Sequence, residues 1–139
     1  MQSWILFAIL SAVFAALVAI FGKVGLGGID STLATTVRAL VMAIFLLIVS
    51  LLLGKVEHIR TINPKIFTFI FLSGIAGALS WLFYFFALKS GPAPGVAALD
   101  RLSVVFVLIF AVLFLAQKFT WKLGIGAIFV AIGAILMSI

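Results

Sequence analysis

Five long apolar stretches dominate this 139-residue chain and constrain its fold more than any other feature. They cover about residues 4–21, 32–53, 66–88, 96–116 and 123–139. A helix needs about 20 apolar residues to cross a bilayer, so five helices would use about 100 residues and leave about 39 for loops and ends. Hydrophobic residue types make up 67% of the chain and charged types 9%, whereas soluble domains carry roughly 45–50% and about 25%. We therefore predict an all-α integral membrane protein.

Short connections rich in helix-breaking residues separate the stretches. Gly25–Ser31 ends in the helix-capping pair Asp30-Ser31, Asn63-Pro64 precedes the third stretch, and Gly91–Gly95 precedes the fourth. Connections this short make consecutive helices antiparallel neighbours and leave no room for a sizeable domain outside the membrane. The predicted architecture is a single domain over residues 1–139, folded as a five-helix up-and-down bundle.

The basic residues suggest an orientation in a cell (inner) membrane. The formal charge is +6, but the charges lie at helix ends and in short loops, a pattern that favours membrane flanks over nucleic-acid binding. The side of the N-terminus holds five basic residues and the other side two, which predicts a cytoplasmic N-terminus and an outer C-terminus. Arg38 and Arg101 lie just inside helices that begin on the other side. If they are counted there, the basic residues divide five against four between the two sides. Insertion in both orientations therefore stays open.

Three charged residues lie within the apolar stretches: Arg38, Asp100 and Arg101. A charge in a membrane span costs about 2.5–3.5 kcal/mol on insertion, so such residues point to a function and a partner. Arg38 follows Thr32 by six residues and Asp100 follows Pro94 by six, which places both at a depth of about 9 Å from the same side. The spacing predicts an Arg38–Asp100 pair, with Arg101 as a surplus positive charge.

Two interpretations of these charges remain open. In the first, they line a polar chamber in which arginine offers a bidentate fork to a carboxylate or phosphate. In the second, Arg38 and Asp100 form a structural clamp between helices, while Arg101 reaches toward the lipid headgroups. The third stretch adds a small and polar stripe that contains Ser80 and Tyr84. The predicted substrate-binding residues are Arg38, Ser80, Trp81, Tyr84, Asp100, Arg101 and Ser103.

Other chemistry has little support. The glycine-rich run 22–28 lacks the Lys-Ser/Thr ending and the strand–helix context of a phosphate loop. His58 is the only histidine and there is no cysteine, whereas a metal site needs several clustered ligands. The serines are plentiful, but no His or acid pairs with them to build a nucleophile. We predict no metal, no cofactor and no enzymatic activity.

The chain resembles an EamA domain of the drug/metabolite transporter superfamily over essentially its whole length. The resemblance rests on Ser80–Leu88 followed by Gly91-Pro92, on Asp100–Ser103, on Lys23–Leu26 with the later Arg38, and on the Gly/Ala-rich segment 124–136. Many members contain ten helices in two inverted units around a central cavity and move small metabolites. The resemblance therefore implies that this single unit needs a partner. The partner is either a second copy of the chain, in a parallel or an antiparallel arrangement, or a homologous five-helix subunit.

One segment departs from the family pattern. Many members end the fourth helix with Leu-Gly-Glu, where this chain has Leu115-Ala116-Gln117-Lys118. The first helix also contains no acidic residue, unlike the small cation exporters that depend on an embedded glutamate. We therefore predict that the protein is not a proton/organic-cation exchanger of that type.

The sequence thus predicts a transporter of small metabolites, amino-acid-like or anionic, that works as a homodimer by alternating access. Arg38 and Arg101 would attract the anionic group, Asp100 would hold Arg38, and Ser80, Trp81 and Tyr84 would line the path. The alternative is a non-transporting membrane subunit or a lipid-handling partner, in which the Arg–Asp pair is purely structural.

Overall fold

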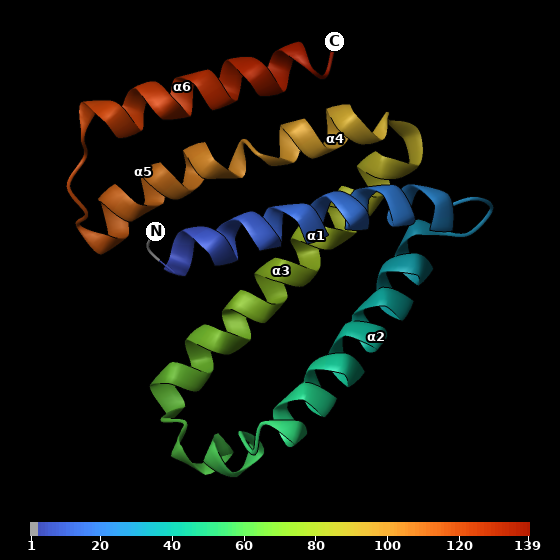
Figure 1. Cartoon of the computed structure of the whole chain (residues 1–139), viewed down its shortest axis with the longest axis vertical. Coiled ribbons are helices and arrows are strands. Elements are labelled where there is room, and N and C mark those ends of the chain that lie inside the picture. The colour runs from blue at the N-terminus through green and yellow to red at the C-terminus, as the bar shows by residue number, and fades with distance from the viewer. Residues whose placement is uncertain (1–2) are drawn as a thin grey trace. The chain divides into compact units, whose positions relative to one another are not determined.

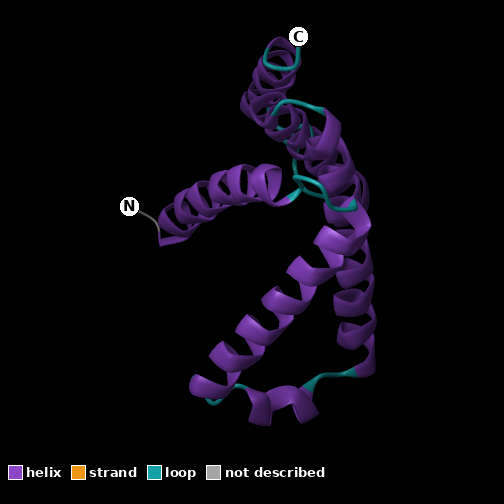
Figure 2. Ribbon diagram, turned by 90° about the vertical axis from the view of Figure 1, so that its right-hand side faces the viewer, coloured by secondary structure: helices purple, strands orange, loops and turns teal. Residues whose placement is uncertain are grey.

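The computed structural model describes residues 3–139, apart from the side chain of Arg60, and this part of the chain is helical with no strands. Figures 1 and 2 show the helices and their short connections. The elements are α1 (Ser3–Gly25), α2 (Ser31–Leu52), the 3₁₀ helix η1 (Val56–Thr61), α3 (Pro64–Ser90), α4 (Ala93–Asp100), α5 (Ser103–Leu115) and α6 (Trp121–Leu136). The all-α prediction is confirmed.

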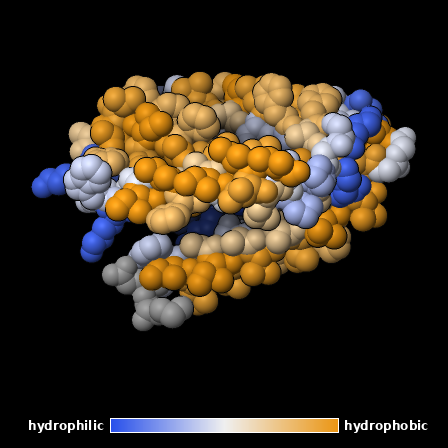
Figure 3. All heavy atoms as spheres, turned by 90° about the horizontal axis from the view of Figure 1, so that it is seen from above, coloured by the Kyte–Doolittle hydropathy of each residue, from blue (hydrophilic) through white to orange (hydrophobic). Residues whose placement is uncertain are grey.

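Four segments in the described part of the chain are long and apolar enough to cross a membrane. They are α1, α2, α3 and the combined segment Ala93–Leu115. The fifth predicted span corresponds to α6, which has 16 residues and reaches about 24 Å against a hydrocarbon core of about 30 Å. Large apolar side chains cover much of the visible surface in Figure 3, and Phe7, Phe69 and Phe129 are all more than half exposed. Such a surface requires lipid as its solvent.

The structure divides the predicted fourth helix (96–116) in two. It begins earlier, at Ala93, because the prolines around it suit a first helical turn. It then breaks at Arg101 and Leu102, where the amides of Arg101, Leu102 and Val104 each bond to a carbonyl three residues back. The break falls at the adjacent charged residues Asp100 and Arg101. Aspartate is a poor residue for a helix interior.

Helix α5 ends at Leu115, and the next residue, Ala116, adopts a left-handed conformation with φ 49° and ψ 30°. Glycine is the usual residue at such a helix end because it pays no steric penalty there. Ala116 therefore adopts a backbone conformation that glycine would adopt at lower cost.

The chain forms two compact units, each described by itself. Unit 1 contains Met1–Val24 and Ser90–Ile139, and unit 2 contains Gly25–Lys89. In unit 1, α6 packs against both α4 and α5, and the buried residues of α6 are Ala127 and Ala134. The ammonium of Lys23 at the end of α1 donates a hydrogen bond of 2.9 Å to the carbonyl of Gly91. This bond ties α1 to the turn before α4.

In unit 2, α2 and α3 converge toward the beginning of α2 and the end of α3, and η1 joins their other ends (Figures 1 and 2). Asp30 caps α2: its carboxylate accepts hydrogen bonds from the amides of Thr32 at 2.8 Å and Leu33 at 3.1 Å. These bonds, led by the one from Leu33, hold the pKa of Asp30 below its ordinary value of 3.8. The cap therefore favours the ionised carboxylate.

Replacing Asp30 with alanine is expected to lower the melting temperature by a few degrees, because α2 loses its cap. Folding lowers the pKa of Asp30. The stabilisation that depends on its charge is therefore complete when the pH is above the ordinary pKa of the carboxyl group. It is lost as the pH falls through the lower pKa of the folded protein. D30N keeps a capping oxygen without the charge, so it should stay near native stability and lose this acid-dependent part. Thermal unfolding in detergent across the acid range checks both variants, and equal melting temperatures for D30A and the native protein would contradict the assignment.

Candidate functional site

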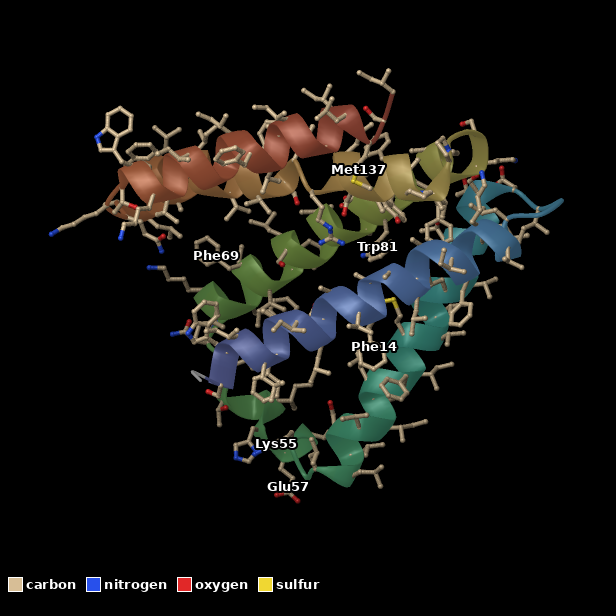
Figure 4. All side chains as sticks on the ribbon, turned by 45° about the horizontal axis from the view of Figure 1, so that its top comes forward. Phe14, Lys55, Glu57, Phe69, Trp81 and Met137 are labelled. Carbon is tan, nitrogen blue, oxygen red and sulfur yellow. The ribbon has the colours of Figure 1, made fainter. Side chains whose placement is uncertain are left out.

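Arg38 is the only charged residue of α2, and its side chain is half-buried. Its guanidinium carbon lies 3.6 Å from the centroid of the Trp81 ring, which projects from α3 (Figure 4). A guanidinium standing on edge at this distance would push its nitrogens below contact distance of the indole, so it lies against the ring face. This stack is a cation–π contact that gains strength where water is excluded.

Two further rings support the indole from the same helix. Trp81 meets Tyr84 edge to face, with centroids 5.3 Å apart and planes at 73°, and meets Phe85 at 6.2 Å and 65°. Phe85 is 3% exposed, and its ring centroid lies 5.7 Å from the guanidinium carbon of Arg38. We call Arg38, Trp81, Tyr84 and Phe85 the Arg38 cluster. The Tyr84 and Phe85 rings are both steeply inclined to the indole and pack against it from the same helix.

Unit 2 offers Arg38 no acidic partner. It contains two acids, Asp30 and Glu57. Asp30 is occupied with the amides that begin α2, and Glu57 lies in η1, beyond the opposite end of that helix. Within the described residues of this unit, the guanidinium lies against the aromatic rings of Trp81 and Phe85. The edges of the guanidinium, which carry its hydrogen-bond donors, are therefore suited to an anion from elsewhere.

Three other predicted site residues gather at the break between α4 and α5 in unit 1. Asp100 is the last residue of α4 and is half-buried, Arg101 lies in the connecting turn and is exposed, and Ser103 begins α5 and is exposed. No backbone hydrogen bond described across the break ends on the carbonyl of Asp100 or begins at the amide of Ser103. Irregular backbone at membrane depth is tolerated where it faces protein or water rather than lipid.

The predicted residues therefore fall into two groups. Arg38, Trp81 and Tyr84 meet in unit 2, and Ser80 precedes them on α3 as an exposed residue. The Arg38–Asp100 pair joins residues of different units and stays a prediction. Sequence reasoning missed Phe85, although it follows Trp81 by four residues and so shares its helix face. Within the described residues, no cluster of three or more metal-ligating side chains occurs.

Comparison with known proteins identifies the family. The model of the EamA-like transporter family matches residues 2–139. The chain belongs to the EamA-like transporter family. One relative, from a Sinorhizobium species, is named "Uncharacterized transporter in cobO 3'region" and is 44% identical over 138 residues, which cover 99% of this chain and 98% of that protein. No solved structure matches the chain.

Family membership confirms the resemblance drawn from Ser80–Leu88, Asp100–Ser103 and the Gly/Ala-rich last helix. Together with the four span-length apolar segments, it establishes a multi-pass membrane protein of a transporter family. The Arg38 cluster lies on α2 and α3, which are two of these span-length segments.

Proposed function

We propose that this protein carries a small metabolite with an anionic group across the cell (inner) membrane, and that Arg38 binds that group. The observation that carries the proposal is a guanidinium in an apolar helix, stacked on Trp81 at 3.6 Å with no acidic partner in its own unit. Placing such a charge in a span costs about 2.5–3.5 kcal/mol. A purely structural role would be served at lower cost by an apolar residue of similar volume.

Alternating access gives most of the predicted residues a role. Asp100 would balance Arg38 while the site is empty and release it when the anion of the substrate arrives. Arg101 adds a second positive charge near the path, and Ser80 and Tyr84 provide hydroxyl groups along it. The break at Arg101–Leu102 places Asp100 and Arg101 beside an interruption of the α-helical hydrogen bonding, and interrupted helices are a common feature of substrate sites in transporters.

A homodimer would complete the transport path. Inverted repeats around a site near the membrane midplane are a general transporter design, and one unit of this size supplies half of a ten-helix arrangement. The basic residues divide five against four between the two sides, a ratio that allows both orientations and so supports an antiparallel pair.

The test is transport by the native protein. Bacterial cells that express it should differ from cells without it in the distribution of one or a few organic anions between cytoplasm and medium, as measured by mass spectrometry. Purified protein in proteoliposomes should then move the same solute, and mass photometry in nanodiscs should detect two copies per particle. Unchanged metabolite distributions and inactive proteoliposomes would favour the non-transporting subunit instead.

A further inference from the structure

We propose that Trp81 is a positioning residue that holds the Arg38 guanidinium flat, so that the site selects a planar monocarboxylate over tetrahedral anions. The inference deepens the proposed function and rests on Arg38 as the anion-binding group. Trp81 itself need not touch the substrate, because it acts through the orientation of Arg38.

The indole of Trp81 restricts the orientation of the Arg38 guanidinium. At 3.6 Å from the ring centroid, one face of the cation is covered by the indole and its donors point outward in a plane along that face. Trp81 cannot easily turn away, because Tyr84 and Phe85 contact it at 5.3 Å and 6.2 Å between centroids. Phe85 also lies near the cation, at 5.7 Å. An unrestrained arginine could tilt its fork to suit many anions, whereas this one is held in one orientation.

A guanidinium held in this orientation suits a carboxylate better than a tetrahedral anion. A carboxylate places two oxygens in one plane and accepts two parallel hydrogen bonds from the guanidinium fork. A sulfonate or phosphate can accept the same two bonds, but its remaining oxygens point out of the donor plane. On the Trp81 side these oxygens would face the indole and its neighbouring rings. A buried oxygen without a donor carries a desolvation penalty.

The charge at the site also limits the charge of the ligand. Arg38 is the single charge of α2, and the charged residues of α3 are Lys65 and Lys89, close to its two ends. With Arg101 and Asp100 included, the charges assigned to the site sum to +1, so a dianion there would keep an excess negative charge in an apolar surrounding. Buried charge without compensation is costly. Charge and shape together favour a monocarboxylate.

The experiment compares three probes with the same propyl group: butyrate, propanesulfonate and propyl phosphate, the last at a pH where it is dianionic. Calorimetric titration of the native protein in nanodiscs should show that butyrate binds about tenfold more tightly than either other anion. W81L should weaken butyrate binding by about threefold to thirtyfold, the range of a cation–π contact, and bring the three affinities together. W81F retains an aromatic face and should retain the preference.

The ratio of affinities separates positioning from a merely structural role. If Trp81 only supported the fold, W81L would weaken all three anions equally and leave the ratio unchanged. F83L is the matched control, because it also replaces a ring with leucine on α3, at a side chain that is 66% exposed and outside the Arg38 cluster. Circular dichroism and size-exclusion profiles establish that each variant folds.

Several outcomes would overturn the inference: no saturable binding of any probe by the native protein, equal affinity for all three, or an unchanged ratio in W81L. These results are distinct from failure of the proposed function, which is measured by transport. If solute transport depends on Arg38 but the probes show no shape preference, the transport proposal stands and the role of Trp81 falls.

Discussion

Replacing Arg38 with alanine is expected to reduce transport by about 30-fold or more, since losing one member of a desolvated charge pair costs about 2–5 kcal/mol. The variant removes the donors that bind the anion and leaves the apolar face of α2 intact. It also removes a charge whose insertion costs about 2.5–3.5 kcal/mol. The protein should therefore reach the membrane at native levels while losing activity. Initial uptake or release rates in proteoliposomes, normalised to inserted protein, measure the effect.

Two matched variants separate the role of the guanidinium from that of charge alone. K55A removes one positive charge from the exposed connection after α2 and should leave transport near native. R38K keeps the charge but loses the planar fork and the stacking surface, so its rate should remain well below native. Native-level transport by R38A would remove Arg38 from the binding site.

Much of the fold followed from the sequence, because membrane helices are encoded by long apolar runs that no soluble fold can bury. The predicted stretches 32–53 and 66–88 correspond to α2 (Ser31–Leu52) and α3 (Pro64–Ser90), and Asp30 caps α2 as its position suggested. The break in the fourth stretch could not be read in the same way. Residues 96–116 contain no glycine or proline, and hydropathy is insensitive to a local shift from i→i−4 to i→i−3 hydrogen bonding.

The candidate site was predicted in part. The cost of charge in lipid identified Arg38, Asp100 and Arg101 as residues that need an explanation, and helical spacing brought Trp81 and Tyr84 into the same group. Sequence reasoning expected an acidic partner for Arg38, whereas the contact found in unit 2 is an aromatic face. Hydropathy counts tryptophan and phenylalanine as apolar and so conceals their negative ring faces, which attract cations. Cation–π partners must therefore be sought by geometry.

A bulky residue at Gly95 is expected to destabilise unit 1. A Cβ at this position would lie 3.2 Å from the carbonyl oxygen of Met137 and 3.4 Å from the Cα of Ser138, both backbone atoms. Gly95 therefore permits the close approach of α4 to the end of α6, as small residues commonly do between membrane helices. Leucine would force the two apart, and overpacking of this kind costs about 1–3 kcal/mol. G95L should lower the melting temperature in detergent by several degrees and reduce the yield of monodisperse protein.

The same substitution at Gly126 provides the control, because a Cβ there meets nothing within 4 Å. G126L adds the same side chain to α6 and improves helix propensity, since glycine in a helix interior is less favourable than ordinary residues by up to about 1 kcal/mol. Its melting temperature should equal or exceed that of the native protein. Because one substitution tests two glycines that differ in the space around them, equal losses at both positions would attribute the effect to added bulk in general and would contradict the specific α4–α6 contact.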